Sequence, residues 1–147
     1  MGLPAGEVMG VTDIGDDCVE WSFPAEPGAV RAARSLVRGQ LRRWGLECMG
    51  DIAALLVSEL VTNALRHATG PIGLRLVAPC AGDGVLRVEV SDSLPEMPRE
   101  RVARPEDEGG RGLQLVASSS RRWGTRPREV GKTVWFELTV PGRRTDA

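Results

Sequence analysis

The sequence predicts an α+β fold: a two-layer α/β sandwich in which helices cover one face of a mixed, mostly antiparallel sheet. Two observations lead to this prediction. Segments with strand-like alternation or short apolar runs outnumber the segments with helical period, and most of the strand segments follow one another as neighbours that can pair as hairpins. The chain has 147 residues, of which 41% are hydrophobic and 27% charged, so it is long enough for one domain with its own core.

The first half of the chain predicts one strand and two helices. Residues 1–17 show little pattern and are expected to form a flexible leader. Residues 18–23 alternate apolar with polar side chains, which predicts a strand. Apolar residues then recur with helical period over residues 27–44 and 51–67, and Gly45 between these segments is typical of a helix C-terminus.

The second half predicts four strands, a long loop and a short helix. In order, these elements are strands at 72–78 and 85–90, a lid at about 93–110, a helix at 112–117, and strands at 122–126 and 134–140. A glycine-rich turn joins the first two of these strands as a hairpin. The lid segment contains several prolines, many charges and few apolar residues. The predicted domain therefore spans residues 18–140 and is followed by a C-terminal tail at 141–147.

The bulk composition argues against several classes of partner and site. The net charge of −1 provides no general attraction to nucleic acid or to an anionic membrane, and no apolar run is long enough to span a bilayer. Three widely spaced cysteines and one histidine do not form a zinc-binding pattern. The N-terminus lacks the order of a signal peptide, so a cytoplasmic protein with reduced thiols is expected. Lys132 is the only lysine, which a GC-rich coding bias explains, but its position is of interest for that reason.

The most informative stretch is the sequence SELVTNALRH at residues 58–67. Glu59 and Asn63 lie four residues apart inside an otherwise apolar helical pattern, so their side chains point the same way. Burying polar groups without partners costs free energy, and the pair is therefore expected to have partners. A carboxylate that can take a proton, one turn from an amide oxygen that can ligate a hard cation, fits magnesium–nucleotide chemistry. His67 shares this stripe, but a lone histidine near a helix end is more often a cap.

Three later motifs are weaker when each is taken alone. Asp92 directly follows an apolar strand and can accept a hydrogen bond from an amino group such as that of adenine, although aspartate at this position is more often part of a turn. In the sequence Gly110-Arg111-Gly112, the glycines let backbone N–H groups approach an anion and the arginine can contact a terminal phosphate; the alternative is a flexible hinge. Thr133 can support base recognition beside Asp92, or it is an ordinary β-branched strand residue.

Taken in order, these motifs resemble those of the GHKL ATPases. They are Glu-x-x-x-Asn on a helix, Asp after a strand, Gly-x-Gly after a lid, and Gly-Lys-Thr before the final strand. This superfamily includes gyrase, heat-shock chaperones, mismatch-repair ATPases and histidine kinases, and the resemblance covers roughly residues 18–140. Within it, the sequences Ser-Glu-Leu-Val-Thr-Asn-Ala and Gly-Gly-Arg-Gly-Leu are similar to those of the anti-sigma-factor serine/threonine kinases.

The resemblance implies a role in phosphoryl transfer for two of the motifs. Glu59 would be the general base that directs a water or a partner's serine hydroxyl at the γ-phosphate of ATP, and Asn63 would ligate Mg²⁺. Gly110 and Gly112 would bind phosphates, with Arg111 near the γ-phosphate. Catalysis would rest mostly on positioning and charge neutralisation, as phosphoryl transfer requires.

The resemblance also implies a site for the base, and here the chain departs from the superfamily. Asp92 would recognise the adenine amino group with support from Thr133. The superfamily usually has Asp-x-Gly-x-Gly at this point, whereas residues 93–96 of this chain contain no glycine. The departure bears on lid closure and on nucleotide affinity.

Two functions follow from the resemblance. The first is an ATP-dependent protein serine/threonine kinase that binds and inhibits a sigma factor and phosphorylates a serine of an anti-sigma-factor antagonist. The second is a catalytically weak or inactive ATP-binding module that regulates a partner by contact alone. A homodimer is implied in either case, and no direct contact with nucleic acid is expected, because the chain has no helix-turn-helix and no basic stripe.

Overall fold

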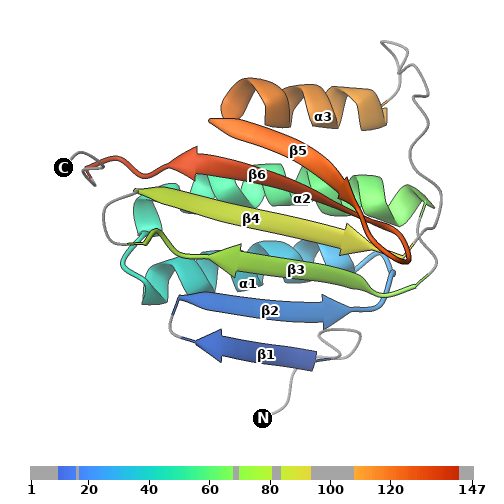
Figure 1. Cartoon of the computed structure of the whole chain (residues 1–147), viewed down its shortest axis with the longest axis horizontal. Coiled ribbons are helices and arrows are strands. Elements are labelled where there is room, and N and C mark those ends of the chain that lie inside the picture. The colour runs from blue at the N-terminus through green and yellow to red at the C-terminus, as the bar shows by residue number, and fades with distance from the viewer. Residues whose placement is uncertain (1–9, 16, 68–69, 81–83, 94–107, 143–147) are drawn as a thin grey trace.

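The computed structural model describes residues 10–15, 17–67, 70–80, 84–93 and 108–142. In this part of the chain the strands are β1 (Gly10–Gly15), β2 (Cys18–Phe23), β3 (Ile72–Val77), β4 (Val85–Asp92), β5 (Arg122–Pro127) and β6 (Lys132–Thr139). The helices are α1 (Ala29–Arg43), α2 (Gly50–His67) and α3 (Glu108–Ser119), with a 3₁₀ turn η1 (Glu47–Met49) before α2. Figure 1 shows the helices together on one side of the sheet. The predicted two-layer α+β fold is therefore confirmed.

The sheet has the strand order β1-β2-β3-β4-β6-β5, and every described pair of neighbours is antiparallel. The expectation of a flexible leader over residues 1–17 is corrected by β1, which pairs with β2 as an edge strand. An edge strand joins a sheet through backbone hydrogen bonds, so a sequence rich in Gly and Asp gives little side-chain signal for it. Residues 1–9 of the expected leader, residues 94–107 of the expected lid and residues 143–147 of the expected tail lie outside the described residues.

One face of the sheet carries the core. Alternate side chains of the strands are buried against the helices because successive residues of a strand point to opposite faces. These side chains are Val19, Trp21 and Phe23 of β2, Ile72, Leu74 and Leu76 of β3, Leu86, Val88 and Val90 of β4, and Val134, Phe136 and Leu138 of β6. None of the described helices covers the opposite face of the sheet (Figure 1), which is called here the open face.

The end of α1 orients the chain toward α2. Gly45 adopts a φ of 74°, and its N–H donates to the carbonyl of Arg42 at 3.1 Å, while the N–H of Leu46 donates to the carbonyl of Leu41 at 2.7 Å. This is a Schellman motif, in which glycine takes the left-handed position without a Cβ penalty. The prediction that Gly45 ends the helix is confirmed.

Helix α2 is strongly apolar. The segment Glu47–Arg66 has the length and hydropathy of a membrane-spanning helix, so the expectation that no run is long enough does not hold by that measure. Its apolar side chains are nevertheless those of a core helix: Ala53, Leu56, Val57, Leu60 and Val61 are each no more than 2% exposed. Burial inside the domain accounts for the hydropathy of α2 without a membrane.

The open face carries a network of charges around β6. Glu137 accepts hydrogen bonds from Arg87 at 2.9 Å and from Arg122 at 3.0 Å. Burial by itself raises the pKa of Glu137, but the hydrogen bonds from these two arginines outweigh burial and hold the pKa below its ordinary value. The Arg87 guanidinium also lies 4.2 Å from the centre of the Trp135 ring. This face is therefore held together by ion pairs and stacking rather than by an apolar layer.

Gly131, between β5 and β6, occupies a position that no other residue fits. It has a φ of 91°, and a Cβ added there would collide with the backbone of Asp92 and Ser93. Gly142 has a similar φ of 82°, but a Cβ added there would meet nothing within 4 Å. Alanine substitutions at Gly131 and Gly142 therefore separate the free-energy cost of the left-handed backbone from that of the collision.

We predict that Gly131→Ala destabilises the protein by more than about 3 kcal/mol, because it adds a backbone collision to the left-handed penalty. Gly142→Ala should carry only that penalty, about 1–2 kcal/mol. Urea denaturation of both variants measures the difference. Equal free energies of unfolding would contradict the close approach of Gly131 to Asp92.

Candidate functional site

The elements that carry the predicted site residues meet at one end of the molecule. Helix α2 contacts both α3 and β4. Figure 1 shows the end of α2, the end of β4 and the beginning of α3 lying toward the same side. Glu59 and Asn63 belong to the C-terminal half of α2, and Asp92 is the last residue of β4. The start of β6 pairs with the end of β4, so the fold brings all four predicted motifs to a common end.

Glu59 and Asn63 lie at the border between the buried and exposed sides of α2. Both are half-buried, and they sit between core residues such as Leu56 and exposed residues such as Leu55, which is 44% exposed. Neither side chain has a hydrogen bond or ion pair in the described part of the chain. The sequence predicts partners for this pair, and half-burial explains how it does without protein partners, because solvent still reaches both groups. A carboxylate and an amide one turn apart are therefore available to a ligand.

Asp92 is paired with the only lysine of the chain. The register of β4 and β6 places Asp92 opposite Lys132, both with the buried residues on the helix-covered face. Lys132 Nζ donates to Asp92 Oδ2 at 2.5 Å, and the two side chains are 5% and 3% exposed. An ion pair this well shielded from water is much stronger than one on the surface. The sequence motifs alone do not indicate Lys132 as a site residue; the one signal is that it is the only lysine in the chain.

The structure corrects the expected placement of Thr133 beside Asp92. Thr133 pairs with Ser91 in the register, one position away from the Asp92–Lys132 pair, and so faces the open side of the sheet. Its hydroxyl lies 2.8 Å from that of Ser91, in hydrogen-bond contact. Neighbouring residues of a strand point to opposite faces, so Thr133 cannot support Asp92 with its side chain. Lys132 takes that position instead.

The Gly110-Arg111-Gly112 sequence lies inside α3 and does not precede it. The helix begins at Glu108, whereas the sequence predicts a start at residue 112. Gly110 falls in the first turn, whose N–H groups have no acceptor within the helix, and Gly112 comes after that turn. The side chain of Arg111 and the lid residues 94–107 are outside the described part of the structure.

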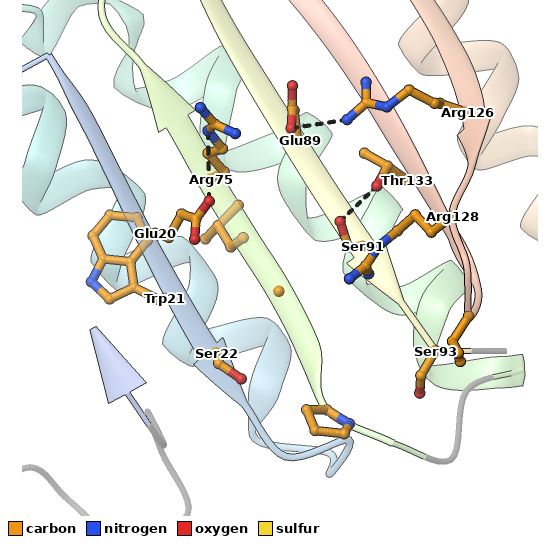
Figure 2. Close-up of a pocket in the computed structure, with 14 residues that line it drawn as sticks. Glu20, Trp21, Ser22, Arg75, Glu89, Ser91, Ser93, Arg126, Arg128 and Thr133 are labelled. Atoms are coloured by element: carbon orange, nitrogen blue, oxygen red, sulfur yellow. Dashed lines mark hydrogen bonds and ion pairs between the residues drawn. The ribbon is translucent and has the colours of Figure 1, made fainter. Parts of the chain in front are cut away.

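A pocket of about 460 Å³ lies on the open face of the sheet (Figure 2). Of the predicted site residues, Thr133 lines it, together with hydroxyl groups, arginines and two glutamates: Ser22, Ser91, Ser93, Arg75, Arg126, Arg128, Glu20 and Glu89. Arg75 lies 3.7 Å from Glu20 and Arg126 lies 3.6 Å from Glu89. Because most of its charges are paired and it lies across the sheet from the Asp92 side chain, this pocket is distinct from the predicted nucleotide site.

The described residues contain no group of three or more His, Cys, Asp or Glu side chains that could hold a metal ion. Asn63 supplies one neutral oxygen at the end of α2. Magnesium keeps several waters and is commonly bound through one or two protein oxygens together with substrate phosphates. The residues present therefore fit a cation that arrives with a nucleotide and not one held by the protein alone.

We predict that Lys132→Met destabilises the protein by about 3 kcal/mol, because it leaves the Asp92 carboxylate buried without its counter-charge. Removing the Thr133 hydroxyl with Thr133→Val should cost about 1 kcal/mol. Arg38→Ala, which breaks an exposed ion pair with Asp51, is the control and should cost less than about 1 kcal/mol. Thermal or urea unfolding measures all three. A loss below 1 kcal/mol for Lys132→Met would contradict a tightly coupled buried pair.

Comparison with known proteins identifies one domain family. Residues 23–138 match the histidine kinase-like ATPase domain family, which covers most of the chain and all of the predicted site residues. Among curated proteins, none matches the chain. The matched range spans α2, the end of β4 and α3, and the match supports ATP binding. The chain belongs to the histidine kinase-like ATPase domain family.

Proposed function

We propose that this protein is an ATP-dependent protein serine/threonine kinase that acts as an anti-sigma factor. It binds Mg·ATP, holds a sigma factor, and transfers the γ-phosphate to a serine of an antagonist protein. The family match supports the ATP-binding part of the proposal. The similarity of residues 58–64 and 109–113 to the anti-sigma-factor kinases supports the choice of substrate and partner.

The observation that carries the proposal is the free pair on α2. Glu59 and Asn63 are half-buried, lie one turn apart and have no protein partner in the described part of the chain. A half-buried carboxylate and amide one turn apart, without protein partners in the described part of the chain, are accessible to a ligand. The pair belongs to the C-terminal half of α2, the half whose end lies toward the end of β4 and the beginning of α3 (Figure 1).

Each residue of the pair has a separate task in the proposed reaction. The Asn63 side-chain oxygen would complete the coordination of Mg²⁺, which when bound neutralises phosphate charge. Glu59 would accept the proton of the substrate serine as its oxygen attacks the γ-phosphorus. The bond between that phosphorus and the β,γ-bridging oxygen breaks, and ADP leaves with that oxygen. Gly110 and Gly112 would bind the phosphates, with Arg111 beside them.

The partners and the setting are part of the same proposal. The sigma factor and the antagonist would be protein partners of a cytoplasmic regulator, and a homodimer would be the working form. Neither nucleic acid nor a membrane is needed for this role. The net charge of −1 fits a protein that regulates transcription through protein contacts and does not bind DNA itself.

A second candidate function is a regulator that binds ATP weakly and acts by contact alone. Two observations favour it: Asp92 is already paired with Lys132, and residues 93–96 contain no glycine. Both features bear on the base end of the site and leave the Glu59–Asn63 pair unchanged. Transfer of phosphate to a partner distinguishes the two functions.

We predict that Asn63→Ala weakens ATP binding at least about tenfold in the presence of Mg²⁺, because it removes the one protein oxygen assigned to the cation. Without Mg²⁺ the wild type and the variant should bind ATP alike. Isothermal calorimetry measures both conditions. Thr62→Ala, at the neighbouring half-buried position, is the matched control and should bind like the wild type. Retention of magnesium-dependent binding by Asn63→Ala would remove Asn63 from the site.

We predict that Glu59→Gln lowers phosphate transfer to a serine-containing antagonist at least about a hundredfold while ATP affinity changes little, because only the proton acceptor is lost. Transfer from γ-labelled ATP, with binding measured in parallel, separates the two effects. Glu47→Gln, at an exposed glutamate paired with Arg42, controls for the loss of one charge. If the wild type binds ATP but never labels an antagonist, the kinase assignment fails and the contact-only regulator stands.

A further inference from the structure

The Asp92–Lys132 pair bears on how this chain would recognise the nucleobase. In the proposed function Asp92 is the carboxylate that accepts a hydrogen bond from an exocyclic amino group of the base. In the structure the same carboxylate already accepts one from Lys132, at 2.5 Å. We propose that Lys132 is an internal competitor for Asp92, which makes nucleotide binding weak and nearly indifferent to the 6-amino group of adenine. This inference rests on the proposed ATP-binding function and adds a specificity-determining residue to it.

The strength of the competition follows from charge and burial. The Lys132 ammonium is a charged donor, and hydrogen bonds between charged groups are roughly twice as strong as those between neutral groups. The adenine amino group is a neutral donor. Both side chains of the pair are at most 5% exposed, so water does little to weaken their attraction. A base that displaced the ammonium would replace a strong contact with a weaker one and would leave a buried cation without its partner.

The backbone around the pair keeps the two groups together. Asp92 and Lys132 are direct partners in the register of β4 and β6. Gly131, the residue before Lys132, packs so closely on the backbone of Asp92 that a Cβ would not fit. Arg128 donates from Nη1 to the Asp92 carbonyl oxygen at 3.3 Å. The ion pair is thus part of the packed end of the sheet and not a loose surface contact.

Two triphosphates separate the base contact from all other contacts with the nucleotide. ATP carries the 6-amino group, and purine riboside 5′-triphosphate has hydrogen at the same carbon. Isothermal calorimetry in Mg²⁺ gives the dissociation constant of each for the wild type, Lys132→Met and Lys132→Arg. Lys132→Met keeps the length of the side chain without a donor, and Lys132→Arg keeps a cationic donor beside Asp92.

We expect the wild type to bind the two triphosphates within about twofold of each other. Lys132→Met should bind ATP about three- to tenfold more tightly than the analogue, because the amino group then donates a hydrogen bond in place of the one that Lys132 gave to Asp92. Lys132→Arg should behave like the wild type. A wild type that prefers ATP more than about fivefold, or a Lys132→Met variant that binds both triphosphates equally, would overturn the inference and leave ATP binding standing.

The failure of the proposed function is a separate result. If the folded wild type and both folded variants bind neither triphosphate, the ATP-binding function fails and the inference fails with it. If Lys132→Met does not fold, the comparison of the two triphosphates on the wild type still decides, because a strong preference for ATP would show that Asp92 is open to the base.

Discussion

The register between β4 and β6 is the constraint on which the candidate site depends. It places Asp92 opposite Lys132 on the helix-covered face and Ser91 opposite Thr133 on the open face. Because side chains alternate along a strand, a slip of one residue would place Thr133 or Gly131 opposite Asp92 and turn the core residues of β6 to the open face. Burial of Val88 and Phe136, both 0% exposed, therefore fixes the partner of Asp92. Packing of the core therefore determines which side chain lies opposite Asp92 at the end of the sheet.

The packing of α2 with one face against the sheet explains where Glu59 and Asn63 lie. A helix that packs on a sheet buries a wide apolar face, and its polar residues remain at the border of that face or on the solvent side. Helix α2 follows this rule, with Leu56 and Leu60 buried and Glu59 and Asn63 half-buried beside them. The pair thus belongs to the helix layer, which is also the layer toward which Asp92 points. A ligand that contacted all three would lie between the helices and the end of β4 (Figure 1).

Local patterns in the sequence predict much of this fold, and nonlocal contacts account for what they miss. The predicted strand at 18–23 and helix at 51–67 agree closely with β2 and α2, because their periods are set by burial of one face. Strand β1 and the early start of α3 are missed, because segments rich in glycine carry little periodic signal. The sequence identifies Asp92 as a candidate but not its partner, since Lys132 lies 40 residues away and depends on the register of two strands. Assigning Thr133 to the base end is the error that this dependence produces.

Under the proposed function, the buried ion pair would link the stability of the free protein to its affinity for a nucleotide. Where the carboxylate of a site has no protein donor, the base donates a hydrogen bond to it on binding. The free energy of that hydrogen bond then stabilises the folded state. Here Lys132 has already supplied it, so a base contributes only the difference between two donors. In the proposed site the phosphates would be bound through the cation on Asn63 and by the start of α3, and neither depends on Asp92. A domain built this way can fold and contact a protein partner without nucleotide, while its phosphate end remains able to take part in transfer. Under the proposed function, regulation by contact and phosphorylation of an antagonist would therefore be compatible in one chain, and the base end would determine how strongly the nucleotide couples them.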